Sequence, residues 1–289
     1  MSVGEPVIQV NDLSHTYLEG TPLVVQALKG VTLEVRRGEA LGIIGRTGAG
    51  KSTTVQHFNG LIRPRERGKV IVFGQDMSDP SLNVRQIRLK VGLVFQYPEA
   101  QLFERLVGDD VAFGPFKMGM PLPEVKERVR WAMDMVGLPF DKFKDRFTFS
   151  LSGGEARKAA IAGVLALRPE VLVLDESTSG VDPRGRKELM ADIRRLHQEE
   201  GLTIVFISSN MEDLASLVDR VYVLDDGRTV MGGSTAEVFS QPERLHAAGL
   251  GVPQITQVMY LLKQRGLPVD ERCVSVAAAE EGLWKILSS

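Results

Sequence analysis

The sequence predicts an α/β fold built around a mostly parallel sheet, and three features carry this prediction. Four short runs of apolar residues have the composition of strands that are buried on both faces, at residues 41–44, 91–95, 171–174 and 203–207. The first run leads into Gly45–Ser52, a full match to the phosphate-binding pattern G-x-x-x-x-G-K-S/T between a strand and a helix. The third run ends in the paired carboxylates Asp175 and Glu176.

Length, charge and cysteine content bound the class of protein. The 289 residues can bury a sizeable core, and a net charge of -2 gives no global reason to expect nucleic acid as a partner. A single cysteine, Cys273, excludes an internal disulfide and favours a reducing compartment, so we expect the cytoplasm. No apolar run approaches the roughly 18 residues of a membrane-spanning helix, and the N-terminus lacks the pattern of a secretion signal. Any membrane role must therefore come through a partner.

Other elements are expected before and after these strands. Residues 7–10 and 31–35 alternate apolar and polar side chains around a turn at 19–22, which predicts an antiparallel subsheet. From residue 98 onward, prolines punctuate helical segments. One helical face there ends at Gly137 and consists of Val125, Val129, Ala132, Met133 and Val136. We interpret this region as a helical insertion into the α/β domain.

The loop Gly45–Ser52 is suited to phosphate. Its glycines let backbone N–H groups approach phosphate oxygens, and the following helix points its positive end at the same place. Lys51 would reach the β and γ phosphates, and Ser52 would place its hydroxyl on Mg²⁺. The expected nucleotide-binding residues of this segment are Gly45, Arg46, Thr47, Gly48, Ala49, Gly50, Lys51, Ser52 and Thr53. The alternative, a glycine-rich turn with a chance Lys-Ser pair, fits poorly with the strand before it and the helix after it.

Asp175 and Glu176 end a buried strand, so period-two geometry predicts that their side chains point to different faces of the strand end. Asp175 would hold a hydrated Mg²⁺, while Glu176 would polarise the attacking water as general base. A strand followed by Asp-Glu also occurs at helix starts without any function. The intact phosphate-binding loop upstream favours the catalytic interpretation.

A second phosphate-binding surface is predicted at Leu151–Glu155, which reads Leu-Ser-Gly-Gly-Glu. Ser152 can accept from the N–H of Glu155, and Glu155 can reach back, so a capping box explains both residues structurally. Gly153 and Gly154 lower helix propensity in a first turn and are useful mainly where something approaches the backbone closely. The local sequence does not separate the two interpretations, and the upstream loop favours the functional one.

Together the two patterns resemble those of the ATP-binding cassette (ABC) ATPases. The resemblance implies a P-loop NTPase fold with a parallel core sheet, an antiparallel β subdomain, a helical subdomain insertion and a small C-terminal extension. It places the nucleotide-binding domain at residues 1–249, with the helical subdomain at about 98–165, and the extension at 250–289. It also implies ATP and Mg²⁺ as cofactors. Two chains would meet head to tail, so that the segment at Ser152 of one chain caps the γ-phosphate bound by the other.

Three further residues match the family pattern individually. Tyr17 resembles the aromatic residue that stacks on adenine, with a half-buried strand tyrosine as the alternative. Gln96 resembles the glutamine that touches Mg²⁺ and links the helical insertion to the site. Asp182, in the loop that starts at Ser179, resembles the residue that bridges the two sites across the dimer interface.

A longer stretch points to one branch of the family. Phe95–Glu104 resembles the corresponding segment of the ATPases of energy-coupling factor (ECF) transporters, and Leu250–Gln257 with Arg265–Pro268 looks like their C-terminal extension. The resemblance covers nearly the whole chain. It implies an importer of vitamins or of cobalt or nickel ions. Glu99 and Glu104 could pair with basic residues on a partner, or be solvated loop carboxylates.

This branch implies three kinds of partner. One is a second ABC ATPase, either a paralogue or another copy of the chain, and the Gly20–Pro22 loop favours a paralogue. The others are a transmembrane coupling subunit and a substrate-binding membrane subunit. The chain would lie on the cytoplasmic face of the cell membrane as a peripheral subunit, with no nucleic acid partner.

The sequence departs from the family at Ser209. The family has a histidine there, at a strand end ahead of a helix, and none of the four histidines, His15, His57, His197 and His246, occupies such a place. We include Ser209 with Glu176 and Gln96 among the catalytic positions. A serine cannot supply the imidazole contact to the γ-phosphate, so the chain's own site is expected to hydrolyse slowly. Alternatively Ser209 serves only as a helix cap, with Glu212 three residues on.

Three functions remain open from the sequence. The first is an ATP-hydrolysing transporter subunit. The second is a non-hydrolytic or weakly hydrolytic subunit that supports a paralogous ATPase. The third is a soluble ABC protein of translation or DNA repair, although the second cassette, coiled-coil insertion or zinc hook usual in such proteins is not visible here.

Overall fold

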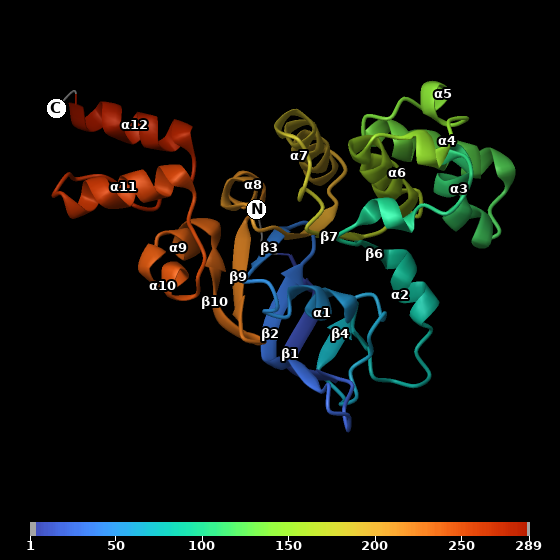
Figure 1. Ribbon diagram of the computed structural model, residues 1–289, viewed down its shortest axis with the longest axis horizontal. Coiled ribbons are helices and arrows are strands. Elements are labelled where there is room, and N and C mark those ends of the chain that lie inside the picture. The colour runs from blue at the N-terminus through green and yellow to red at the C-terminus, as the bar shows by residue number, and fades with distance from the viewer. Residues whose placement is uncertain (1–3, 288–289) are drawn as a thin grey trace.

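The computed structural model describes residues 4–287, apart from the side chains of residues 98, 99 and 287. Two sheets form its centre, with helices on both sides (Figure 1). The larger sheet has six strands in the order β10-β9-β3-β8-β7-β6, and the strands from β9 to β6 run parallel. Their bounds are β3 Ala40–Ile44, β6 Val91–Val94, β7 Val171–Asp175, β8 Thr203–Ile207, β9 Arg220–Asp225 and β10 Arg228–Ser234. The predicted parallel core sheet is confirmed.

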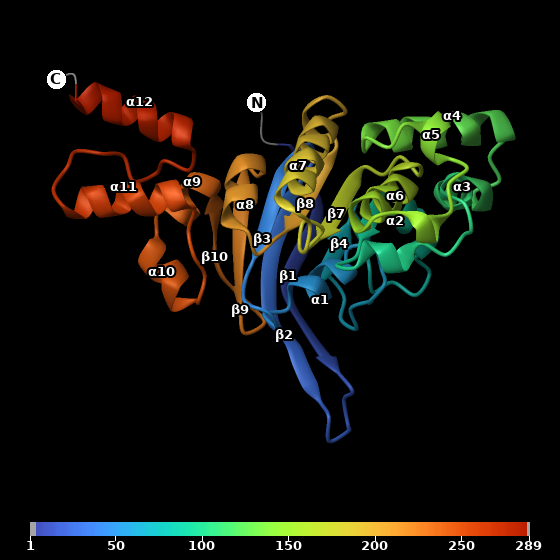
Figure 2. The same ribbon diagram turned by 45° about the horizontal axis from the view of Figure 1, so that its top comes forward.

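The smaller sheet is antiparallel, as predicted, and has the order β2-β1-β4-β5. Its strands are β1 Pro6–Tyr17, β2 Val25–Arg36, β4 Val70–Val72 and β5 Gln75–Asp76. The first two are longer than the alternating patterns at 7–10 and 31–35 indicated. They form a ribbon that projects well beyond the other strands in Figure 2.

Buried strands divide the core into two parts. Every residue of β3, β7 and β8 is buried, and successive side chains point to opposite faces. Leu172 and Leu174 pack with the helical region, whereas Val171 and Val173 pack with the antiparallel sheet. The carboxyl ends of these strands are thereby fixed from both sides, and the loops that leave them carry the candidate site.

Helices between β6 and β7 make up the region expected as a helical insertion, seen in green in Figure 1. The α-helices of this region are α3 Val107–Lys117, α4 Leu122–Met135, α5 Phe140–Phe143 and α6 Gly153–Leu165. The predicted apolar stripe of α4 is buried, and Gly137 follows it with a φ of 67°. A further helix, α2 Val84–Lys90, precedes β6.

The remaining helices surround the phosphate-binding loop or follow the sheet. Their bounds are α1 Lys51–Gln56, α7 Pro183–Gln198, α8 Met211–Leu217, α9 Thr235–Phe239 and α10 Pro242–Ala247. Beyond them, α11 Gln254–Gln264 and α12 Val276–Leu287 lie side by side at one end of the molecule (Figures 1 and 2). This pair encloses a small core of its own, centred on Met259, Val269 and Ala279.

Candidate nucleotide-binding site

The loop between β3 and α1 has the backbone that phosphate binding needs. Gly48 and Gly50 have φ values of 84° and 96°, in the left-handed region that favours glycine. A Cβ atom at Gly50 would lie 2.5 Å from Leu28 Cδ2 and 2.8 Å from the Ala27 carbonyl oxygen. None of the described side chains caps α1, so the N–H groups of its first turn are available to an anion.

Lys51 lies inside this loop. Its side chain is largely buried, and Nζ donates to the carbonyl oxygens of Gly45, at 2.8 Å, and Arg46, at 3.1 Å. Burial lowers the pKa of Lys51, while the charges of Glu176 and Asp175 act in the opposite direction. The ammonium group therefore stands over the loop's own backbone, at the place where the pattern expects phosphate charge.

The other residues of the loop differ in what they present. Ala49 is buried in the core, so only its backbone can face a ligand, whereas Thr47 is exposed. The Arg46 side chain is turned toward Gly249, where an added Cβ would lie about 2 Å from the guanidinium. Thr53 accepts a hydrogen bond from the Tyr17 hydroxyl at 3.3 Å, which places Tyr17 beside α1.

Asp175, Ser52 and Gln96 line or face a common cavity next to the loop. Burial raises the pKa of Asp175, and the neighbouring Ser52 hydroxyl acts in the opposite direction. The Oδ1 atom of Asp175 is buried and has no hydrogen-bond partner among the described residues. Carboxylate, hydroxyl and amide oxygens are the ligands that Mg²⁺ prefers. The residues present therefore fit a magnesium ion.

Glu176 lies just outside β7, and its direction is not set by strand alternation as the sequence suggested. Its φ is 50°, so the chain turns through the left-handed region directly after Asp175. Its N–H donates to the Ile207 carbonyl at the end of β8, 3.0 Å away. Such a conformation is uncommon for a residue with a side chain and tends to occur at functional sites.

Ser209 contacts Glu176 directly. The Ser209 backbone N–H and hydroxyl both donate to Glu176 Oε2, at 3.2 Å and 3.3 Å. The interpretation of Ser209 as a helix cap is wrong, because Asn210 is the N-cap of α8 and accepts from the N–H of Asp213 at 2.9 Å. Ser209 thus lies in contact with the candidate base.

The segment at the start of α6 forms the predicted capping box. Ser152 accepts from the N–H of Glu155 at 3.3 Å, and Glu155 accepts from the N–H of Ser152 at 2.8 Å. Gly153 and Gly154 have ordinary helical surroundings, and a Cβ atom at either would meet nothing within 4 Å. The surroundings within this chain therefore leave room for another group to approach the backbone at these two glycines.

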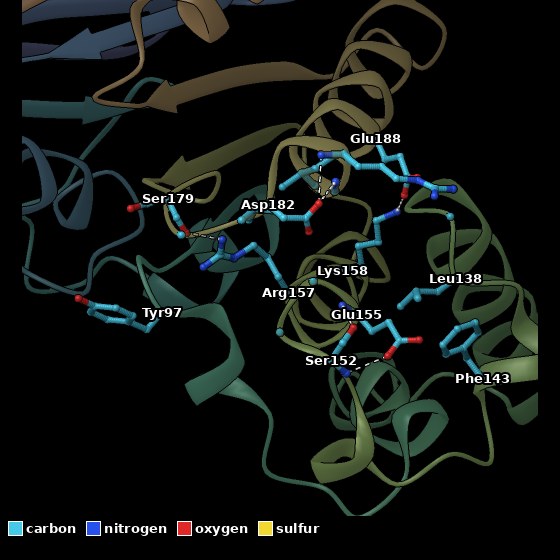
Figure 3. A pocket seen from close by; sticks show the side chains of 18 of the residues that line it. Tyr97, Leu138, Phe143, Ser152, Glu155, Arg157, Lys158, Ser179, Asp182 and Glu188 are labelled. Carbon is cyan, nitrogen blue, oxygen red and sulfur yellow. Dashed lines mark hydrogen bonds and ion pairs between the residues drawn. The ribbon is translucent and has the colours of Figure 1, made fainter.

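Asp182 belongs to a cleft that is separate from the phosphate-binding loop. It caps α7 by accepting from the N–H groups of Arg184 and Gly185, both at 3.0 Å. The cleft lies between the starts of α6 and α7 and is lined by Ser152 to Glu155 as well as by Asp182 (Figure 3). No residue of Gly45–Ser52 is among its lining residues, whereas Gln96 lines both this cleft and the cavity beside Asp175.

Sequence reasoning missed several residues that support these segments. Arg157 is buried in the cleft and donates from Nη1 to the Ser179 carbonyl oxygen at 2.7 Å, which joins α6 to the loop before α7 (Figure 3). Arg186 and Asp213 join α7 to α8 through a bidentate contact. Neither contact has a sequence signal, because each joins segments that are distant along the chain.

A glycine-rich loop between strand and helix, a buried aspartate at the end of a neighbouring strand and a glutamate after it define a P-loop nucleoside triphosphatase. The sequence model of the ABC transporter family matches residues 28–179. The energy-coupling factor transporter ATP-binding protein EcfA2 of Clostridium perfringens is 44% identical over 280 residues, 97% of this chain and 98% of that protein. The protein of the same name from Symbiobacterium thermophilum is 45% identical over 276 residues, 96% and 95% of the two chains.

Solved structures agree with this assignment. That of cbiO1 from Clostridium perfringens, described as part of the ABC transporter complex cbiONQ, has a TM-score of 0.74 at 33% identity and covers 90% of this chain and 99% of its own. A dimeric ATP-binding cassette in a post-hydrolysis state, bound to ADP and Pi, has a TM-score of 0.70 at 26% identity, with coverages of 79% and 98%. The chain therefore belongs to the ABC transporter family, as one of its ATP-binding cassette ATPases.

No helix in the described part of the chain, residues 4–287, combines the length and apolar character needed to cross a membrane.

Proposed function

We propose that the chain is the ATP-binding and ATP-hydrolysing subunit of an ECF-type importer. One observation supports a site that is formed by two chains. Ser52 of the phosphate-binding loop lines the cavity beside Asp175, whereas the Ser152–Glu155 segment lines a cleft to which the loop contributes no lining residue, and a Cβ atom at Gly153 or Gly154 would meet nothing within 4 Å. Two half-sites of this kind become complete when two chains meet head to tail around two nucleotides.

The residues of one half-site divide the work. Tyr17 would stack on adenine, the loop with Lys51 would hold the phosphates, and Ser52, Asp175 and Gln96 would hold Mg²⁺. The ion would neutralise phosphate charge when bound. Glu176 would accept the proton of the attacking water, with its carboxylate held by Ser209. The partner's Ser152 segment would cap the γ-phosphate, and Asp182 would lie at the junction of the two sites.

The names of the relatives support the assignment of partners and place. We infer a second ABC ATPase as the dimer partner, with a paralogue favoured, and a transmembrane coupling subunit with a substrate-binding membrane subunit. The chain would act at the cytoplasmic face of the membrane, for a vitamin or for cobalt or nickel ions. We propose residues 1–249 as the nucleotide-binding domain, and 250–289 as an extension, because α11 and α12 enclose a core of their own.

A weakly hydrolytic subunit is the second candidate, and Ser209 favours it. Ser209 makes two hydrogen bonds to Glu176 Oε2, and no imidazole is present at that position. The nucleotide would then act mainly to hold the pair of chains together, and the paralogue would supply most of the turnover.

Co-purification and steady-state turnover test the proposal together. The chain should extract from membranes with two integral membrane proteins and a second ATPase, and the complex should hydrolyse ATP. Turnover by the chain alone that equals turnover by the pair would exclude the weakly hydrolytic role. Recovery of the chain without membrane proteins, in a fraction that still hydrolyses ATP, would contradict the transporter assignment.

A further inference from the structure

Two histidines that the nucleotide motifs do not use lie near Tyr17: His15 contacts the Tyr17 ring, and His57 contacts His15. Residues two apart on a strand share a face, and residues four apart on a helix do so as well. His15 and Tyr17 of β1 therefore face Thr53 and His57, which lie at the start and the end of α1. These four side chains connect the antiparallel ribbon to the helix that follows the phosphate-binding loop.

Each of these four residues contacts the next, and the last contacts the first. The rings of His15 and Tyr17 meet edge to face, with centroids 4.5 Å apart, and those of His15 and His57 do so at 5.2 Å. The Tyr17 hydroxyl donates to Thr53 Oγ1 at 3.3 Å. The last contact is at the Thr53 carbonyl oxygen, which accepts a hydrogen bond from His57 Nδ1 at 2.7 Å. Because a carbonyl oxygen only accepts, His57 carries its proton on Nδ1.

His57 is the most firmly held of these four side chains. Its side chain has no exposed surface, and its Nε2 has no hydrogen-bond partner among the described residues. Packing and the single bond to Thr53 therefore determine its position. His15 is only half buried, and Tyr17 is 37% exposed. A tyrosine that exposed at a strand end would otherwise exchange between staggered rotamers.

We propose that His15, supported by His57, is a positioning residue that holds the Tyr17 ring in the orientation that stacks on adenine. The inference rests on the assignment of Tyr17 to adenine in the proposed function. A ring that is already oriented loses less side-chain freedom when the base binds, so affinity rises without any new contact to the nucleotide. The Thr53 bond also fixes the distance of the base platform from the helix that follows the phosphate-binding loop.

Calorimetry on the full-length chain tests this role with two probes. One is the non-hydrolysable ATP analogue adenylyl imidodiphosphate with Mg²⁺, and the other is inorganic tripolyphosphate, which has no base. His15→Ala should lower the affinity for the analogue by about three- to tenfold, the range expected for loss of one edge-to-face aromatic pair. Tripolyphosphate affinity should not change. His15→Phe, which keeps an aromatic edge beside Tyr17, should restore analogue affinity to within about twofold.

Tyr17→Ala separates the possible failures. If Tyr17→Ala lowers the affinity for the analogue and His15→Ala does not, His15 has no positioning role. If Tyr17→Ala itself leaves analogue affinity unchanged, the adenine assignment is wrong and the inference falls with it. Equal weakening of the analogue and tripolyphosphate by His15→Ala would show a general structural role instead. Thermal melting of each variant establishes that the chain is folded at the temperature of the titration.

Discussion

At the scale of single residues, the contact between Ser209 and Glu176 shows where a sequence pattern stops being informative. The missing histidine could be identified from the sequence, because the strand before it and the helix after it were visible. The partner of Ser209 could not, because Ser208, Ser209 and Asn210 are all good caps and only one of them begins the helix. Likewise nothing in the sequence indicated that Glu176 adopts a φ of 50°.

Replacing Ser209 by His should raise turnover at the site formed by this chain's own phosphate-binding loop. A single donor to the transition state is worth roughly a hundredfold in rate, and the affinity for ATP should change little because the contact matters mainly in the transition state. Steady-state ATPase assays with the chain and its partner measure both quantities. Flat turnover in Ser209→His, together with loss of turnover in Glu176→Gln, would show that Ser209 or Asn210 already does this work.

His57 predicts a dependence of stability on pH. Burial lowers the pKa of His57 to about 4, below its ordinary value of 6.5. The unfolded chain therefore binds this proton at a higher pH than the folded chain, and the free energy of unfolding falls as the pH is lowered through this window. At roughly 1.4 kcal/mol per pKa unit the full loss is about 3.5 kcal/mol, most of which falls between pH 6.5 and 4. Urea unfolding of wild type and His57→Gln should show this difference between pH 6.5 and 4.

Other groups titrate in the same window, and the comparison of two proteins removes them. Burial raises the pKa of Glu39 and of Asp175, and these carboxylates are present in both chains. Their effects cancel in the difference between wild type and variant. A difference that stays constant with pH would contradict the buried, neutral state of His57.

At the scale of elements, the strands could be predicted and the C-terminal helices could not. The strands β3, β7 and β8 are buried on both faces, so their sequences are continuous apolar runs that only a central sheet can accommodate. In the extension the buried core is small and is centred on Met259, Val269 and Ala279. Because no motif of the sequence lies in this pair and its core is separate from the sheet, the way in which the two helices pack could not be predicted.

Arg186 and Asp213 join α7 to α8. Arg186 Nε and Nη2 donate to the Asp213 carboxylate at 2.9 Å and 3.0 Å, and Asp213 is almost completely buried. Because Asp182 starts α7 and Asn210 starts α8, this pair fixes the Asp182 loop relative to Ser209.

Arg186→Ala should therefore lower the ATPase rate with little change in ATP affinity. It should also destabilise the chain by about 1–3 kcal/mol, since it leaves a buried carboxylate without its partner. The separate variant Asp213→Glu keeps both charges of the pair and should retain more of the ATPase rate than Arg186→Ala does. Loss of ATP affinity in Arg186→Ala at an unchanged turnover number would contradict this coupling between α7 and α8.

At the scale of the whole molecule, the central claim is that each complete site is formed by two chains. The sequence contained both phosphate-binding patterns, and the cleft lined by Ser152–Glu155 has no lining residue from Gly45–Ser52. Which surfaces meet in the assembly depends on the three-dimensional arrangement of α6, α7 and the phosphate-binding loop, and that arrangement could be expected only from the family resemblance. Gly154 offers a direct test, because a side chain there meets nothing within this chain.

The decisive measurement is the molecular mass of the Glu176→Gln chain with ATP and Mg²⁺, alone and mixed with the ATPase with which it co-purifies. Light scattering should show an ATP-dependent pair, which Gly154→Asp should abolish by placing a negative charge against the partner's γ-phosphate. Gly282→Asp, at another helical glycine with open surroundings, is the matched control and should leave the pair intact. ATP affinity of the monomer should be unchanged in both variants. A pair that persists with Gly154→Asp, or a monomer that loses ATP affinity, would contradict the head-to-tail arrangement.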